Sequence, residues 1–166
     1  MTRVSTKSVT AIGALAWIAF VALAVMGLGV GTAATDQDVV TFADPGRVAG
    51  IVMFLVALVA FVASSVGFAL RRRDRASVLI SLLLGLITWV AYVFGTIPGW
   101  LLSHAISGAP DTDAPRVFVA AFFAVESAAR WPAAVVGVAA ALVAWGYLAV
   151  VARAVREAAT ATANAD

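Results

Sequence analysis

The sequence predicts an all-α, polytopic membrane protein with four transmembrane helices in an antiparallel bundle and a short helical outer cap. Three observations predict this class: 63% of the residues are hydrophobic, 12% are charged, and the mean hydropathy is +1.03. A soluble chain of 166 residues could not bury that much apolar surface. No polar stretch is long enough for a separate soluble module, so we expect residues 1–166 to form a single integral membrane domain.

The first two predicted spans are uninterrupted apolar segments. A hydrocarbon core of about 30 Å takes about 20 helical residues to cross. The first span covers about residues 11–33 and carries no charge. The second covers about residues 48–70 and follows Asp44 and Pro45. Aspartate caps the free amides of a helix and proline suits its first turn, so these two residues predict the start of the second helix.

The third and fourth spans are bounded by prolines. The third covers about residues 77–97 and ends at "IPGW", where proline and glycine together predict a break. A helix running from residue 115 to residue 153 would be about 57 Å long, which exceeds one crossing even when it is tilted. Pro132 has no amide hydrogen to donate, which predicts a break there and a fourth span at 132–152. Residues 98–131 are then expected to form the outer cap.

The basic residues predict the orientation, because short connections rich in Lys and Arg stay on the cytoplasmic side. Eight of the eleven basic residues lie before the first span, between the second and third, and after the fourth: Arg3, Lys7, Arg71, Arg72, Arg73, Arg75, Arg153 and Arg156. We therefore expect a multi-pass protein of the cell membrane with both termini cytoplasmic. In an alternative interpretation residues 1–34 are a cleaved signal, although the apolar run is longer than the about 7 to 15 residues typical of one.

The stretch "AVESAARWPA" at residues 124–133 contains a candidate ion pair, Glu126 and Arg130. Their spacing of four residues, with the glutamate first, favours a pair across one helical turn. One interpretation places this pair at the outer interface beside Trp131, where aromatic and basic side chains anchor helices. The other places it over the bundle interior, since an ionisable residue within a membrane marks a pathway or a proton site. The pair is thus either interfacial or buried.

A candidate polar stripe lies on the third span, where Ser81, Gly85, Thr88 and Tyr92 recur at helical spacing. These residues could line a polar path through the membrane. Small and hydroxylated residues are also the usual contacts between helices in lipid, with hydroxyls bonded to their own helix. The stripe therefore has a transport interpretation and a packing interpretation.

Most chemical functions lack the residues that they need. The chain has no cysteine and a single histidine, His104, which excludes thiolate sites, disulfides and histidine clusters for haem or di-iron. The "GLGVGT" stretch at 27–32 lacks the lysine of a phosphate-binding loop. The outer aspartates could attract a divalent cation, but acidic outer loops also follow from retention of basic residues inside. We expect no enzyme, and no catalytic, cofactor-binding or metal-binding residues.

The "DQDVV…DPGR" connection, the "RRRDR" turn and the "WPAAVVGVAAALVAWGYLA" helix give the chain a characteristic layout. This layout resembles the small four-helix membrane proteins of unknown function found in high-GC Gram-positive bacteria. Ten arginines against one lysine fit such a genome. We expect the bacterial inner membrane as the location, and the resemblance implies no activity and no site residues.

Two classes of function follow from these observations. The first is a non-enzymatic structural or accessory membrane protein that binds the lipid bilayer and a membrane-protein partner. The second is a small transporter or channel that works as a homo-oligomer, with Glu126 as its polar site. The basic clusters flank apolar spans rather than forming one face, so we expect no nucleic-acid partner despite a pI near 9.7.

Overall fold

The computed structural model describes residues 6–35, 44–71, 77–107 and 131–163. These ranges hold five α-helices and no strand: α1 (Thr6–Thr35), α2 (Asp44–Arg71), α3 (Val78–Phe94), α4 (Thr96–Ser107) and α6 (Trp131–Ala163). With α3 and α4 taken together, four helices are long and apolar enough to cross a membrane: Val9–Val30, Ala49–Arg71, Val78–Ser103 and Pro132–Ala161. The predicted all-helical class with four candidate spans is confirmed.

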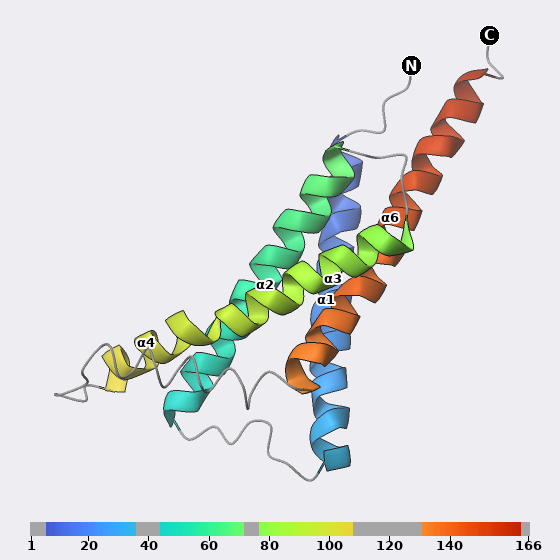
Figure 1. Cartoon of the computed structure of the whole chain (residues 1–166). Coiled ribbons are helices and arrows are strands. Elements are labelled where there is room, and N and C mark those ends of the chain that lie inside the picture. Colours follow the sequence, from blue (N-terminus) through green and yellow to red (C-terminus); the bar gives the residue numbers. More distant parts are fainter. Residues whose placement is uncertain (1–5, 36–43, 72–76, 108–130, 164–166) are drawn as a thin grey trace.

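The helices alternate in direction along the chain, as Figure 1 shows. The start of α1, the end of α2 and the end of α6 lie toward one end of the molecule, while α3 crosses the other helices obliquely. α6 packs against both α3 and α1, and α2 packs mainly against α3 and α4. α1 and α2 contact each other over fewer residues. The ring of Phe20 in α1 stacks on Phe54 and Phe61 of α2, at centroid distances of 6.1 and 4.6 Å.

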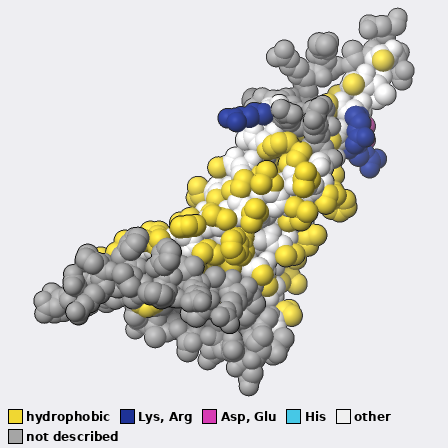
Figure 2. All heavy atoms as spheres, viewed as in Figure 1, with side chains coloured by type: hydrophobic (Ala, Val, Ile, Leu, Met, Phe, Trp, Pro, Cys, Tyr) yellow, Lys and Arg dark blue, Asp and Glu magenta, His cyan; other side chains and the backbone are white. Residues whose placement is uncertain are grey.

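Large apolar side chains lie on the outside of the described helices. Leu79 is 75% exposed and Val30 is 68% exposed, whereas a soluble protein would bury such residues. Figure 2 shows these hydrophobic side chains covering the middle of the visible face, with basic side chains toward one end. An apolar belt with charges outside it is the surface that a multi-pass membrane protein presents to lipid.

The junction of α3 and α4 differs from the expected break at "IPGW". The break lies at Gly95, and the helix resumes at Thr96 and runs through Pro98. Pro98 cannot donate to the carbonyl of Phe94 and its ring disfavours that turn, so the disturbance falls before the proline rather than after it. The amides of Gly95 and Gly99 still donate to Ala91 O at 2.9 Å and Gly95 O at 3.0 Å. α4 therefore continues α3 with a local break.

The helices extend beyond the predicted spans, most of all α4 and α6, and the membrane boundaries themselves stay predictions. α6 continues from Trp131 to Ala163, past the predicted limit at residue 152. α4 covers the first ten residues of the predicted cap, 98–107. The rest of that cap, 108–130, lies outside the described residues.

Candidate functional site

The predicted polar stripe lies on the buried face of α3. Ser81, Thr88 and Tyr92 are 2%, 0% and 8% exposed. The hydroxyl of Ser81 donates to Ser77 O at 3.1 Å, and that of Thr88 donates to Leu84 O at 2.9 Å. Both hydroxyls are therefore satisfied by carbonyls one turn earlier in the chain, which is the usual arrangement of such side chains in apolar surroundings.

Gly85, in the middle of the stripe, lies directly against α6. A Cβ atom on Gly85 would lie 2.7 Å from both Gly137 O and the Cβ of Ala141. A Cβ atom on Gly137 would in turn lie 3.1 Å from the Cβ of Trp89. Real Cβ atoms essentially never approach within 3.0 Å. The backbones of α3 and α6 are in contact here because both helices place glycine at the crossing, so α6 fills the space beside Gly85.

A second close contact joins α4 to α2. A Cβ on Gly95 would lie 2.8 Å from the Cα of Met53, and one on Gly99 would lie 2.9 Å from the Cα of Ala49. Ser103, one turn further along α4, is 1% exposed. Within the described part of the chain, its Oγ is the one buried side-chain polar atom without a hydrogen-bond partner. Sequence reasoning did not single out Ser103, because one serine in an apolar helix carries no pattern.

A hydrogen bond joins the first and last described helices. Tyr147 of α6 is 3% exposed, and its hydroxyl donates to Val9 O of α1 at 3.1 Å. Gly13, one turn after Val9, lies beside this bond: a Cβ there would be 3.1 Å from Val66 Cγ2 of α2 and 3.4 Å from the Tyr147 hydroxyl. The bond fixes α6 against the beginning of α1, a contact between distant segments that no local sequence signal indicates.

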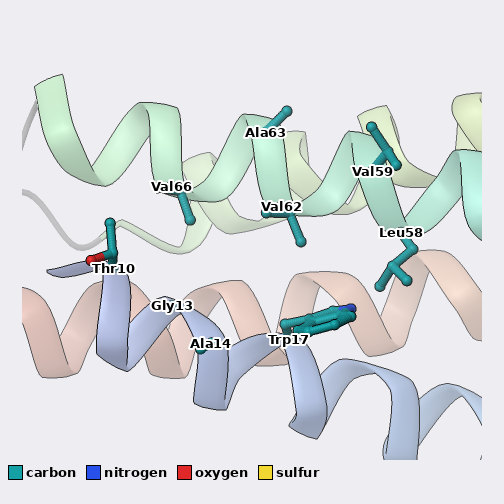
Figure 3. A pocket seen from close by; sticks show the side chains of 9 residues that line it. All are labelled: Thr10, Gly13, Ala14, Trp17, Leu58, Val59, Val62, Ala63 and Val66. Atoms are coloured by element: carbon teal, nitrogen blue, oxygen red, sulfur yellow. The ribbon is translucent and has the colours of Figure 1, made fainter. Parts of the chain in front are cut away.

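An apolar groove separates α1 and α2 near this end of the molecule. Its volume is about 510 Å³. Four residues of α1 and five of α2 line it: Thr10, Gly13, Ala14, Trp17, Leu58, Val59, Val62, Ala63 and Val66. Figure 3 shows Thr10 and Val66 toward one end of the groove and Trp17 and Leu58 toward the other. Sequence reasoning missed this groove because its residue types match those of any lipid-facing helix.

The charged side chains that the structure describes are not the ones predicted as site candidates. Glu126 and Arg130 lie outside the described residues, as does the side chain of His104. The structure instead shows an exposed pair near the end of α6, where Arg153 Nε lies 2.8 Å from Glu157 Oε1. Among the described residues, no group of three or more His, Cys, Asp or Glu side chains could hold a metal ion.

One comparison with known proteins identifies a family. A family of unknown function (DUF6121) matches residues 1–165, which is nearly the whole chain. No curated protein and no solved structure matches the chain. The match agrees with the resemblance to proteins of unknown function and carries no information on their source or role.

Proposed function

We propose that this chain, which belongs to the family of unknown function DUF6121, is a non-enzymatic integral membrane protein with a structural or accessory role. Its four apolar helices indicate a multi-pass membrane protein. The observation that carries the proposed role is the close contact between α3 and α6 at Gly85. A polar path along the α3 stripe would need space beside its hydroxyls, and α6 occupies that space beside Gly85.

The buried polar residues of the described helices support the same role. They are Ser65, Ser81, Thr88, Thr96 and Ser103, all of them hydroxyl side chains without charge. Ser65 and Thr96 donate to Phe61 O and Val93 O of the preceding turn, as Ser81 and Thr88 do to theirs. A transport pathway typically places ionisable residues within the membrane. Four of these five hydroxyls bond to the preceding turn and so serve packing, whereas Ser103 Oγ has no partner.

An accessory role also needs a surface for a partner, and the outer faces of the helices provide it. Leu15, Ile18 and Met26 of α1 are 67%, 61% and 67% exposed. In lipid, association depends on close packing and on interhelical hydrogen bonds rather than on burial from water. The partner in this proposal is a second membrane protein, and both termini of the chain are cytoplasmic.

Two measurements on one preparation test the role. The tagged chain is extracted in digitonin and its complexes are weighed by native mass spectrometry. We expect a complex with a second membrane protein at fixed stoichiometry. The purified chain is also reconstituted into liposomes that contain potassium chloride and a pH-sensitive dye. We expect ion and proton leakage equal to that of protein-free liposomes.

The contradicting result is specific to the α3 stripe. Homo-oligomers that conduct ions, with a rate changed by Thr88→Val and unchanged by Val90→Thr on the exposed face of α3, would support a channel. The role proposed above would then be wrong. Thr88→Val keeps the side-chain shape, so a change in conduction would report on the hydroxyl itself.

A further inference from the structure

The contact between α4 and α2 combines two close backbone approaches with one buried polar group. Gly95, Gly99 and Ser103 are spaced four residues apart, so they share the side of the helix that lies against α2. Leu101 and Ala105, on the opposite side of α4, are exposed. Figure 1 shows α4 beside the first turns of α2. Ser103 is therefore buried on the side of α4 that docks on α2.

The hydroxyl of Ser103 is the exception among the buried hydroxyls of the described helices. Ser65, Ser81, Thr88 and Thr96 each donate to a carbonyl of the preceding turn, which satisfies them within their own helix. The Oγ atom of Ser103 has no such partner. A hydroxyl that is buried without a partner loses the hydrogen bonds that it would make with water. That loss opposes the packing of α4 on α2.

The connection between α3 and α4 leaves α4 free to change direction. The helix breaks at Gly95, and Pro98 has no amide hydrogen for the helical bond to the carbonyl of Phe94. Prolines are the usual sites at which helices bend. Beyond the break, α4 contacts α2 over many residues and α3 over few. The position of α4 thus depends mainly on its contact with α2.

We infer that α4 is a movable element with two positions, docked on α2 as in the structure and undocked from it, and that the unpaired Ser103 hydroxyl favours undocking. Ser103 is the last residue of the candidate span Val78–Ser103, so undocking brings its hydroxyl to the membrane interface, where water bonds it. Undocking also uncovers Ala49, which is 3% exposed and lies against Gly99. The equilibrium goes beyond the proposed accessory role and does not depend on it.

The reaction of a cysteine at position 49 with a maleimide measures the undocked fraction. Ala49→Cys is introduced into the full chain, which has no other cysteine, and the purified protein is labelled in detergent. A thiol covered by α4 reacts only while α4 is undocked, so the rate follows the undocked fraction. In this background, Ser103→Ala should slow labelling about fivefold or more, which corresponds to about 1 kcal/mol. Docking would then no longer bury an unpaired hydroxyl.

Two further variants in the same background serve as references. Ser65→Ala is the matched control, because it also removes a buried hydroxyl but one that has a partner, Phe61 O. It should not slow labelling. Gly99→Leu should speed labelling, because its side chain would clash with the Ala49 backbone and force α4 away.

Thermal unfolding without the reporter cysteine provides an independent measurement. Ser103→Ala and Ser65→Ala gain the same helix propensity, since both replace serine by alanine within a helix. We expect the melting temperature of Ser103→Ala to lie above that of the unmodified chain. The melting temperature of Ser65→Ala should lie below that of Ser103→Ala, because only Ser65→Ala removes a hydrogen bond.

Three outcomes would overturn the two-position equilibrium. Equal labelling rates and melting temperatures for Ser103→Ala and Ser65→Ala would show that the Ser103 hydroxyl carries no penalty, as when it turns to the carbonyl of Gly99. Faster labelling after Ser103→Ala would show that the hydroxyl stabilises docking. A labelling rate that Gly99→Leu leaves unchanged would show that α4 does not control access to position 49.

Discussion

Single glycines determine how closely the helices approach one another. Gly85 and Gly137 allow backbone contact between α3 and α6, while a Cβ atom added to Gly146 of α6 would meet nothing within 4 Å. The sequence alone does not distinguish these positions, since each is a glycine in an apolar helix. The atoms packed around each glycine distinguish them, and they predict opposite effects of a glycine-to-alanine substitution.

Gly85→Ala should destabilise the protein by about 1–3 kcal/mol, the usual cost of adding a methylene group to a filled interior. The new methyl group would meet a backbone carbonyl, Gly137 O, which cannot turn away as a flexible side chain could. Thermal and denaturant unfolding in detergent measure the change. Gly146→Ala is the control and should be neutral or stabilising by up to about 1 kcal/mol, because alanine favours a helix. Equal effects of the two substitutions would show that the contact is not close.

Tyr147→Phe should have a small effect, near the about 0.6 kcal/mol typical of hydrogen bonds between membrane helices. It removes the hydroxyl that donates to Val9 O at 3.1 Å. As a helix carbonyl, Val9 O also accepts the amide four residues later, so no buried acceptor loses its last partner. Unfolding of Tyr147→Leu provides the comparison, since that change removes the ring as well. Equal losses for the two variants would contradict a role for the ring in packing.

At the scale of elements, α4 is held to α2 by glycines one helical turn apart. Gly95 at the break and Gly99 of α4 place their backbone against Met53 and Ala49 of α2. The proline that causes the break, Pro98, lies between them and is exposed. The break and the close approach thus occur in the same turn. This arrangement directs α4 along α2 and buries Ser103 on the same side.

Displacement of α4 can be measured through Ser103, because the chain has no cysteine of its own. Ser103→Cys should react slowly with a maleimide, since residue 103 is 1% exposed. Adding Gly99→Leu should speed the reaction at least severalfold, because the side chain would clash with the Ala49 backbone and separate the helices. Gly67→Leu in the same background is the control, as a Cβ at Gly67 meets nothing within 4 Å. Unchanged labelling in both variants would contradict the contact.

The sequence predicted the helices better than it predicted their contacts. Apolar length predicted four candidate spans, because a membrane imposes that length on the local sequence. The position of the α3–α4 break was two residues from the predicted end of the span, since proline disturbs the turn before it. The sequence singled out the residues of the polar stripe, but the acceptors of their hydroxyl groups depend on the three-dimensional arrangement of the helix. The α1–α2 groove was missed because it depends on how two helices pack.

At the scale of the whole molecule, the basic side chains of the described residues lie near the ends of α2 and α6. Arg71 ends α2, and Arg153 and Arg156 lie near the end of α6. Figures 1 and 2 place these ends toward the same side as the start of α1. A single crossing by each of the four candidate spans would put both termini on that side. The basic residues of the sequence then predict which side is cytoplasmic.

Cysteine labelling in intact cells should show that both termini and the connection after α2 are cytoplasmic. Cysteines are introduced one at a time at Ser5, Gln37, Asp74, Thr112 and Thr162, and are exposed to a thiol reagent that cannot cross the membrane. Gln37 and Thr112 should be labelled in intact cells, because basic connections are retained inside and these two connections hold few basic residues. Ser5, Asp74 and Thr162 should react after the cells are opened, which also controls for reagent access. Labelling of Asp74 in intact cells, with Gln37 and Thr112 silent, would invert the topology. Labelling of Ser5 and Thr162 on opposite sides would require an odd number of crossings and contradict four spans.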